Sequence, residues 1–250
     1  MSNHQKRMTT PGSWRIAKKT NTYVTKTAPG PHDKTAMPIV VWLRDHMGFA
    51  LTMREAKQIL NQKAVLVNGR PAKDTKLGIG IFDVISIPRV GKHYRIMMNP
   101  AGYFTSQEIS AEEANVRLCK IQDKTIVPGG KVQLNLLYGA NVLADNSYKP
   151  MDTIVLTLNE KTEGGEGAAQ ERFTIVEHYP FAVGNYAIVI GGRHAGMIGK
   201  IVEIQKTHSS VPNRVILEDE AGQCRFDTIQ DYVFTIGRDA GAAKRWGIAQ

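Results

Sequence analysis

The sequence predicts an α+β protein with several domains. We expect a small module of two helices and a β-hairpin, a central β-rich domain and a small C-terminal β-barrel, with basic extended segments at both ends. Two short amphipathic helical patterns stand together between residues 39 and 60, and most later apolar runs are short and rich in β-branched residues. Glycine-rich and proline-rich turns separate these runs, which is typical of strands joined by tight turns.

The composition excludes disordered and helical membrane proteins. The chain has 250 residues, of which 42% are hydrophobic, so it can bury real cores in one to three domains. No apolar run approaches the roughly 20 residues that a membrane span needs. The start, Met1–Arg7, carries no apolar segment after its charges, so we expect no secretory signal.

The charge balance indicates a polyanionic partner. Lys and Arg number 32 against 23 Asp and Glu, a net charge of +9. An excess of this size favours nucleic acid first and an anionic membrane second. We expect no membrane, no small-molecule substrate and no cofactor.

The cysteines carry no visible chemistry. Only Cys119 and Cys224 are present, and two distant cysteines provide neither a zinc site nor a disulfide framework. We expect both to be buried small apolar residues in a reducing cytosol, and no bound metal.

Residues 1–36 form a basic arm that Pro and Gly keep from forming a long helix. Such a segment cannot bury a core alone, so we expect a partner to order it. Its cations would neutralise phosphates while Trp14 stacks on exposed bases. A flexible solubilising tail is the alternative. The candidate RNA contacts are Lys6, Arg7, Trp14, Arg15, Lys18 and Lys19.

Residues 37–92 contain the helix-helix-hairpin module. We predict helices at 39–46 and 54–60, with Thr52 and Glu55 forming a capping box at the start of the second. The runs 65–67 and 82–87 predict strands, with a tight turn at Asn68-Gly69 after the first.

Cations gather on this module. A cationic helix face beside a cationic loop can straddle a phosphate backbone, although each charge alone would be an ordinary surface residue. The candidates are Arg44, Arg54, Lys57, Arg70, Lys73 and Lys76.

Residues 93–178 read as a β-rich domain with one helix, which we expect to begin at Ser110 and to continue through Cys119. Strands are predicted at 94–98, 132–137, 154–158 and 173–176. The turn Gly164–Gly167 lacks the Lys-Ser/Thr and the helix of a phosphate-binding loop. No acidic pair has a spacing suited to acid–base catalysis, so this domain is interpreted as a structural spacer.

Residues 179–237 predict a small antiparallel barrel. A strand at 187–190 leads into a glycine-rich loop and a second strand, and further strands are expected at 214–217, 224–226 and 232–236. The loop presents Arg193 and His194, and Lys200 enters the next strand. His194 lacks a second metal ligand nearby, so it is either an RNA contact or a simple surface residue.

The tail, 238–250, again places cations beside an aromatic residue. Its candidate contacts are Lys244, Arg245 and Trp246. We expect an irregular or partly helical segment, and we expect both arm and tail to be disordered without RNA.

Two stretches resemble known RNA-binding units. Residues 37–90 resemble a small module shared by several ribosomal proteins and RNA-modifying enzymes, and Gly184–Ile204 resembles the KOW motif. The whole chain resembles the small-subunit ribosomal protein S-four-e family of archaea and eukaryotes. The matching positions run in order along the chain and include His4, Lys6-Arg7, Ser13-Trp14, Gly30-Pro31-His32, Asn68-Gly69, Asp83-Val84-Ile85, Leu118-Cys119-Lys120, Gly191-Gly192, Gly196 and Phe234-Thr235-Ile236-Gly237.

The resemblance implies a non-enzymatic structural constituent of the small ribosomal subunit, with an SH3-like C-terminal barrel. Its partners would be small-subunit ribosomal RNA and neighbouring ribosomal proteins in the cytoplasmic ribosome. The chain ends soon after Trp246, earlier than eukaryotic members, so we expect an archaeal or otherwise short member.

Two alternatives stay open at this point. A KOW-containing transcription elongation factor would share the barrel motif. An RNA-modifying enzyme would share the first module, but it would need a convergent acid, base or nucleophile that the later residues do not display.

Overall fold

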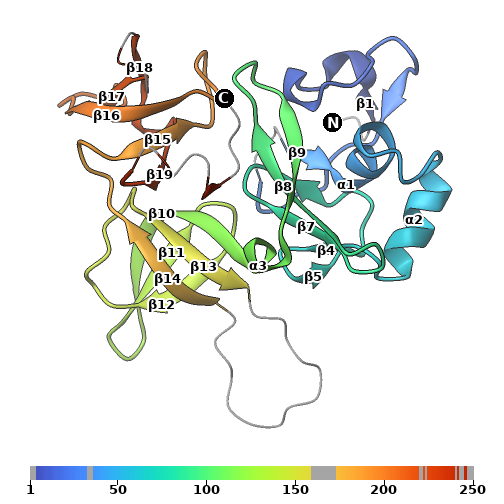
Figure 1. Cartoon of the computed structure of the whole chain (residues 1–250), viewed down its shortest axis with the longest axis horizontal. Coiled ribbons are helices and arrows are strands. Elements are labelled where there is room, and N and C mark those ends of the chain that lie inside the picture. Colours follow the sequence, from blue (N-terminus) through green and yellow to red (C-terminus); the bar gives the residue numbers. More distant parts are fainter. Residues whose placement is uncertain are drawn as a thin grey trace. The chain divides into compact units, whose positions relative to one another are not determined.

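The computed structural model describes residues 4–32, 36–158, 173–219, 222, 224–239, 241, 245 and 246. The chain divides into two compact units (Figure 1). The first comprises Met1–Met97, Tyr103–Arg117 and Leu158–Arg172, and the second comprises Met98–Gly102, Leu118–Thr157 and Phe173–Gln250. Each unit is described separately below.

The arm folds within the first unit. Strand β1 (Gln5–Lys6) pairs with β2 (Tyr23–Val24), and the short helices η1 (Arg7–Thr9) and η2 (Gly12–Trp14) lie between them. The Trp14 side chain is 1% exposed, and its carbonyl oxygen lies 2.7 Å from Nε2 of His46. The arm is therefore packed into the first unit, where the indole ring is buried.

Both helices of the module form where the sequence predicts them. Helix α1 (Ile39–Val41) continues directly into the wider π-helical turn η3 (Trp42–His46). Helix α2 (Met53–Asn61) begins at the predicted cap, where the Glu55 amide donates to Thr52 Oγ1 at 3.3 Å. The Glu55 carboxylate in turn accepts from the Leu51 amide at 2.9 Å, which lowers the pKa of Glu55.

The sheet of the first unit extends beyond the predicted module. Its strand order is β5-β4-β7-β8-β9, and a short pair, β3 with β6, stands apart. Strands β8 and β9 continue this sheet past the boundary expected at residues 92 and 93. The bounds are β3 (Met37–Pro38), β4 (Leu66–Val67), β5 (Arg70–Pro71), β6 (Gly78–Ile79), β7 (Val84–Ile87), β8 (Lys92–Met98) and β9 (Phe104–Ile109).

The helix expected from Ser110 is much shorter than predicted. Its cap is correct, since the Glu113 amide donates to Ser110 Oγ, but α3 covers only Ala111–Ala114. The chain then enters the long strand β10 (Val116–Val127). Local capping favoured a helix, but pairing of 116–127 with neighbouring strands and burial of its first half decided for a strand.

The second unit contains two five-stranded sheets. The central sheet has the order β12-β11-β10-β13-β14, and Cys119, Ile121, Leu134, Ile154 and Leu156 belong to its core. Cys119 is buried as expected. The other strands of this sheet are β11 (Lys131–Leu136), β12 (Asn141–Ala144), β13 (Thr153–Leu158) and β14 (Phe173–Tyr179).

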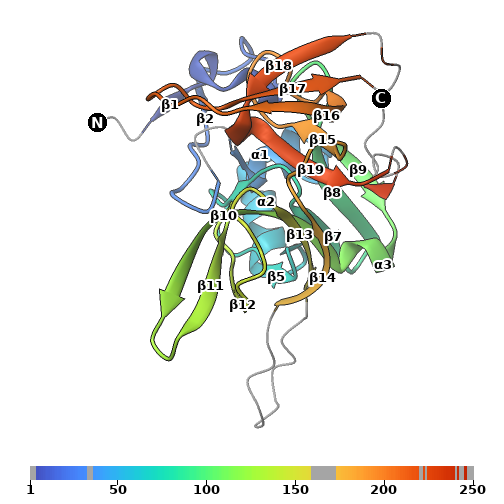
Figure 2. The ribbon, with the colours of Figure 1, turned by 90° about the vertical axis from the view of Figure 1, so that its left-hand side faces the viewer.

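The C-terminal sheet has the order β18-β17-β16-β15-β19 (Figure 2). Neighbouring strands are antiparallel, and their inward side chains, including Ala187, Val189, Ile201 and Val215, form a separate core. The elements are β15 (Tyr186–Val189), β16 (Ile198–Gln205), β17 (Arg214–Glu218), β18 (Arg225–Ile229), η4 (Gln230–Tyr232) and β19 (Val233–Gly237).

The sequence also makes predictions about Cys224, the turn Gly164–Gly167 and the length of the helices. Cys224 is exposed, contrary to prediction, because it precedes the outermost strand β18. The turn Gly164–Gly167 lies outside the described residues. No helix in the described part of the chain combines the length and apolar character that a membrane crossing requires.

Candidate nucleic-acid interface

Most predicted RNA-contacting cations of the first unit lie at its surface without an acidic partner. Within the described part of the chain, none of their side chains forms an ion pair with a carboxylate. The exposed set is Lys6, Arg15, Lys18, Lys19, Arg54, Lys57, Arg70, Lys73 and Lys76. In the second unit, Arg193 and Lys200 have the same character.

This distribution of charge is suited to binding a polyanion. Cations that are not neutralised internally keep their full attraction for phosphate groups, and binding releases the counterions of the nucleic acid. The exposed charges of α2 (Arg54 and Lys57) and of the segment 70–76 belong to one compact unit. They therefore form a set of solvent-exposed cations on a single unit.

Two predicted contacts are instead used inside the first unit. Arg7 is 4% exposed, its Nε donates to the Ala17 carbonyl at 2.5 Å, and its Nη2 lies 3.3 Å from Asp45 Oδ1. Arg44 is partly exposed, and its Nη2 lies 2.7 Å from Asp45 Oδ2. Arg7 is thus a structural cation rather than an RNA contact, because burial of a guanidinium requires acceptors at close range.

The two tryptophans of arm and tail are not available for base stacking. Trp14 is buried in the first unit, and Trp246 is 3% exposed with its indole N–H donating to the Ile236 carbonyl at 3.0 Å. Both stacking predictions are corrected. Burial of a large indole ring within the protein stabilises the fold, and a sequence pattern of cations beside aromatic residues does not show whether the ring is buried or exposed.

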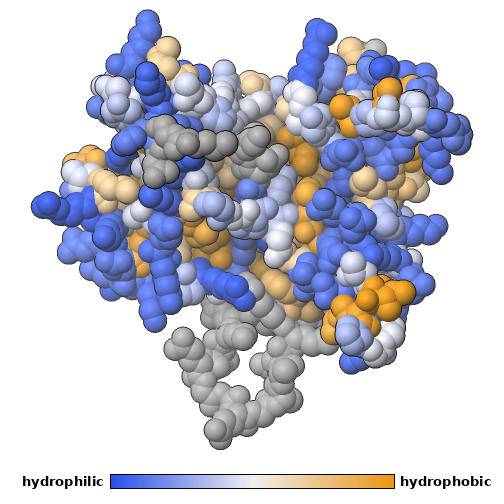
Figure 3. Space-filling view, turned by 180° about the vertical axis from the view of Figure 1, so that it is seen from behind, coloured by the Kyte–Doolittle hydropathy of each residue, from blue (hydrophilic) through white to orange (hydrophobic). Residues whose placement is uncertain are grey.

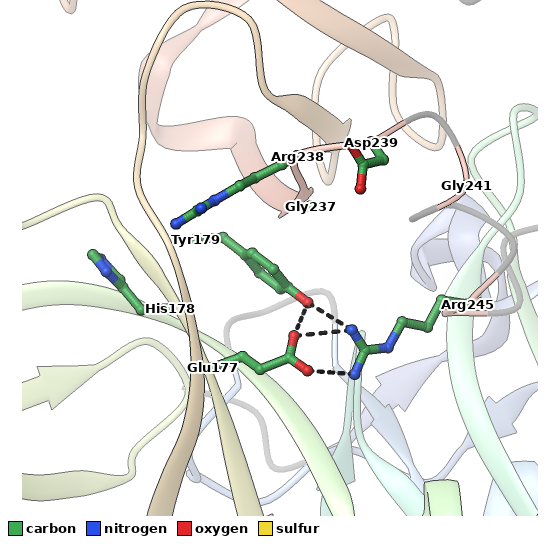
Figure 4. Close-up of a pocket in the computed structure, with 8 residues that line it drawn as sticks. All are labelled: Glu177, His178, Tyr179, Gly237, Arg238, Asp239, Gly241 and Arg245. Carbon is green, nitrogen blue, oxygen red and sulfur yellow. Dashed lines mark hydrogen bonds and ion pairs between the residues drawn. The ribbon is translucent and has the colours of Figure 1, made fainter.

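The tail is anchored through Arg245. Its guanidinium makes two parallel contacts with Glu177, Nη2 to Oε1 at 2.6 Å and Nη1 to Oε2 at 2.9 Å, and it also donates to the Tyr179 hydroxyl (Figure 4). The predicted RNA contact at Arg245 is therefore corrected to an anchor whose charge is largely matched by Glu177. Lys244 lies outside the described residues.

A hollow of about 490 Å³ adjoins this anchor. Hydrogen bonds from Arg245 and Tyr179 lower the pKa of Glu177, whereas burial and the bond to Glu177 raise the pKa of Tyr179 to about 12. The negative charges of the acidic side chains that line the hollow balance the positive charges of the arginines, so the hollow does not favour an anion. It is lined by Glu177, His178, Tyr179, Gly237, Arg238, Asp239, Gly241 and Arg245 (Figure 4).

A buried carboxylate organises the first unit behind its exposed cations. Asp83 is 1% exposed and accepts from Asn68 Nδ2 at 2.8 Å, from Arg117 Nη2 at 2.8 Å and from the Gly80 amide at 3.0 Å. His32 Nε2 completes the set at 2.5 Å from Asp83 Oδ2.

This network fixes two parts of the surface at once. Asn68, at φ +50°, forms the tight turn with Gly69, and its side-chain oxygen also accepts from the Val84 amide at 2.9 Å. His32 belongs to the arm, and a Cβ at Gly80 would lie 2.2 Å from its ring. Burial opposes ionisation of Asp83, but the charges of His32 and Arg117 outweigh it and lower the pKa of Asp83 to about 2.

The glycine-rich loop between β15 and β16 of the second unit presents an exposed cation. Arg193 is exposed, whereas His194 is partly buried and stacks on Phe226 with ring centroids 5.1 Å apart. Gly192 has φ +81° and Gly196 has φ +83°, conformations that glycine adopts without strain. His194 therefore supports the loop, and Arg193 is its projecting group.

Sequence reasoning missed some exposed cations. Lys63 follows α2 at φ +53°, Lys206 follows β16, and Arg238 follows β19. Each stands within two residues of the end of a helix or strand, a position that local patterns could have identified. The buried charged residues Asp83 and Lys120 had no such signal, because their partners are distant in sequence.

Two further features are the hydropathy of one face of the molecule and the grouping of possible metal ligands among the described residues. Hydrophilic residues dominate the face in Figure 3, and apolar residues gather there only in small patches. Within the described residues, His, Cys, Asp and Glu form no group of three that could hold a metal ion. The arrangement is suited to binding by charge and shape.

Family models match successive segments of the chain. The RS4NT domain matches residues 1–35, the S4 domain residues 37–85, the Ribosomal family S4e residues 90–162 and the KOW motif residues 183–218. The chain is also 49% identical over 250 residues to the small ribosomal subunit protein eS4 of Methanospirillum hungatei, covering 100% of both chains.

The chain belongs to the ribosomal S4e family. The eS4 protein of Archaeoglobus fulgidus is 41% identical over 94% of this chain and 93% of its own length. The crystal structure of the 30S ribosomal protein S4e from Thermoplasma acidophilum matches with a TM-score of 0.63 and 28% identity. The match covers 81% of this S4e-family chain and 95% of the Thermoplasma acidophilum chain.

Proposed function

We propose that this S4e-family chain is a non-enzymatic structural constituent of the small ribosomal subunit that binds ribosomal RNA and supports translation. The observation that carries the proposal is the set of exposed cations without acidic partners on the arm, α2, the segment 70–76 and the barrel loop. Membership of a family whose relatives are named small ribosomal subunit proteins supports small-subunit ribosomal RNA as the partner.

The proposed RNA contacts are the exposed cations that have no acidic partner among the described residues. RNA phosphates contact the exposed cations, while buried and internally paired groups hold the surface in place. The proposed contacts are Lys6, Arg15, Lys18, Lys19, Arg54, Lys57, Arg70, Lys73, Lys76, Arg193 and Lys200, with partly exposed Arg44 at the margin. Lys244 remains a proposed contact from the sequence.

The finer organisation is also part of the proposal. We assign the C-terminal sheet, residues 179–237, to an SH3-like barrel, on the support of five short antiparallel strands around a common core. The arm (1–36), the RNA-binding module with its β8–β9 extension, the central β-rich domain and the tail (238–250) complete the division. Neighbouring ribosomal proteins would be further partners in the cytoplasmic ribosome.

The two alternative functions have no support. Relatives of the full chain are named as ribosomal proteins rather than elongation factors or RNA-modifying enzymes. The hollow beside Arg245 is lined by two carboxylates, Glu177 and Asp239, and by two guanidinium groups, Arg238 and Arg245.

Density-gradient sedimentation of cell extract at increasing salt tests the proposal. We expect the chain to sediment with the small subunit and to resist washing at moderate salt, because many moderate contacts add up. Detection at the top of the gradient, or with RNA polymerase, would contradict a ribosomal role.

A filter-binding titration with small-subunit ribosomal RNA tests the contact list. If six to ten of the proposed cations meet phosphates, affinity falls about 10³–10⁵-fold between 50 and 200 mM salt. The control is Arg225→Ala, which removes a cation whose Nε already lies 3.2 Å from Glu218 Oε1. Equal losses from Arg225→Ala and Arg54→Ala would refute the sorting of cations by their internal partners.

A further inference from the structure

We propose that Lys120 is the positioning residue of the barrel's basic loop: its buried ammonium group holds the short helix η4, on which the Gly191-Gly192 turn rests. The inference deepens the proposed function and rests on it, because the loop matters here as the support of the RNA contact Arg193.

The first step is the geometry of the ammonium group. Lys120 lies on β10 of the central sheet and is 3% exposed. Its Nζ donates to three backbone carbonyls, those of Gln230 at 3.3 Å, Asp231 at 3.0 Å and Val233 at 2.8 Å. An ammonium group has three donors, so all of its hydrogen-bonding capacity is directed at one short segment.

The second step leads from η4 to the loop. The backbone carbonyl of Tyr232, inside the segment that Lys120 holds, accepts the Ile190 amide at 2.8 Å. The Tyr232 ring packs directly on the following turn: a Cβ at Gly191 would lie 3.0 Å from it, and a Cβ at Gly192 3.4 Å. Glycine at both positions lets the ring support the backbone closely.

The third step concerns the far side of the loop. His194 stacks on Phe226, and Gly196 is pressed against the turn at Asn99, where an added Cβ would meet the carbonyl oxygen at 1.9 Å. Asn99 and Gly196 belong to the same compact unit. The loop is therefore fixed on both flanks, and Arg193 projects from between them.

Burial makes hydrogen-bond acceptors necessary for the ammonium group. A buried cation without acceptors is strongly unfavourable, so the three carbonyls and the ammonium group require one another. The nearby charge of Asp231 opposes the effect of burial on the lysine pKa, which nonetheless falls to about 8. The family resemblance at Leu118-Cys119-Lys120 thus coincides with a contact to residues more than 100 positions away.

The test is a double-mutant cycle in the full-length protein, with an in vitro transcript of archaeal small-subunit ribosomal RNA as the probe. Arg193→Ala should weaken binding about 5–10-fold and reduce the salt slope by about 1, as expected for one lost phosphate contact. Lys120→Met should weaken binding about 3–10-fold with the same reduced slope. The affinity of the double variant for the RNA should equal that of whichever single variant binds less tightly, because both changes remove the same contact.

Lys131→Met is the matched control. It removes the same charge from an exposed position on the neighbouring strand β11, and it should change affinity less than twofold. Amide exchange of the free proteins provides an independent readout. The Ile190 amide should exchange at least tenfold faster in Lys120→Met than in Lys131→Met.

The outcomes separate the inference from the proposed function. If Arg193→Ala has no effect on binding, the proposed RNA contact at the loop is wrong. If Arg193→Ala acts but Lys120→Met binds normally, or if the two losses simply multiply, the positioning role is overturned. Should Lys120→Met fail to fold, Tyr232→Ala removes the next link in the chain at a surface position, and it must show the same non-additivity with Arg193→Ala.

Discussion

Each unit of the protein places a buried charge behind a glycine-containing turn, but the two charges are satisfied in different ways. In the first unit, Asp83 collects four donors, two of them from the cationic or ionisable side chains Arg117 and His32. In the second unit, Lys120 donates to three neutral carbonyls. The pKa of the carboxyl falls to about 2 and that of the lysine to about 8.

The difference shows that a buried charge can be matched by counter-charges or by dipoles alone, with opposite consequences. Counter-charges outweigh the cost of burying Asp83, so its ionised form is favoured in the folded protein. Carbonyl dipoles do not fully replace water around Lys120, so its charged form is disfavoured there. The stability that Asp83 contributes therefore changes with pH in acid, and the stability that Lys120 contributes changes with pH in alkali.

The largest expected effect is the loss of the Asp83 charge. Asp83→Asn leaves Arg117 buried without its counter-ion, so we expect the free energy of unfolding to fall by about 3–5 kcal/mol. Chemical denaturation of the full chain measures it. Asp227→Asn is the control, because its pair with Arg214 is more than half exposed on both sides, and it should cost less than about 1 kcal/mol. Equal costs would remove the distinction between buried and surface pairs.

Alkaline pH should sharpen the contrast next. Between pH 8 and 10.5 the unfolded chain holds the Lys120 proton that the folded chain has released, so stability rises with pH across this window. The stability difference between wild type and Lys120→Met should change by about 3 kcal/mol in favour of wild type. Tyr179 titrates in both proteins and cancels. A flat difference would show that Lys120 keeps its ordinary pKa of 10.5.

Acid should act on the first unit in the opposite sense. The folded-state pKa of Asp83, about 2, lies below its ordinary value of 3.8, so its contribution is complete above pH 3.8 and disappears as the pH falls through 2. We expect about 2 kcal/mol of acid-dependent stability in wild type that Asp83→Asn lacks. Parallel acid titrations of the two proteins would contradict this expectation.

The smallest expected effect is at the tail anchor. The Arg245 and Glu177 side chains are 56% and 33% exposed, so Glu177→Gln should cost only about 0.5–1 kcal/mol. The same change removes the carboxylate that raises the pKa of Tyr179, so that pKa should move down from about 12 towards 10. Ultraviolet titration of the tyrosines measures this shift. An unchanged Tyr179 pKa would mean that burial alone sets it.

Local patterns predicted the elements that local interactions form. The cap at Thr52 and the turn at Asn68-Gly69 depend on residues a few positions apart, and both are present. The helix expected through Cys119 failed, because strand pairing across the central sheet overrides a good helix cap. Strand pairing also joins β8 to β7 across the boundary expected at residues 92 and 93.

The candidate interface divided in the same way. Charge and motif spacing located the exposed cations of α2, the segment 70–76 and the barrel loop, because solvent exposure is the ordinary state of Lys and Arg. They did not separate these from Arg7 and Arg245, which have acidic partners inside the fold. Nor did they show that Trp14 and Trp246 are buried.

The sequence by itself determined that this is a basic α+β chain with the motifs of the S4e family, because composition, caps and turn signals act over short distances. Only the tertiary structure decided which charges face solvent and which hold the fold. Asp83 meets His32 across 51 positions, and Lys120 meets Val233 across 113. The environment of a charge depends on such distant partners, and short-range patterns do not contain them.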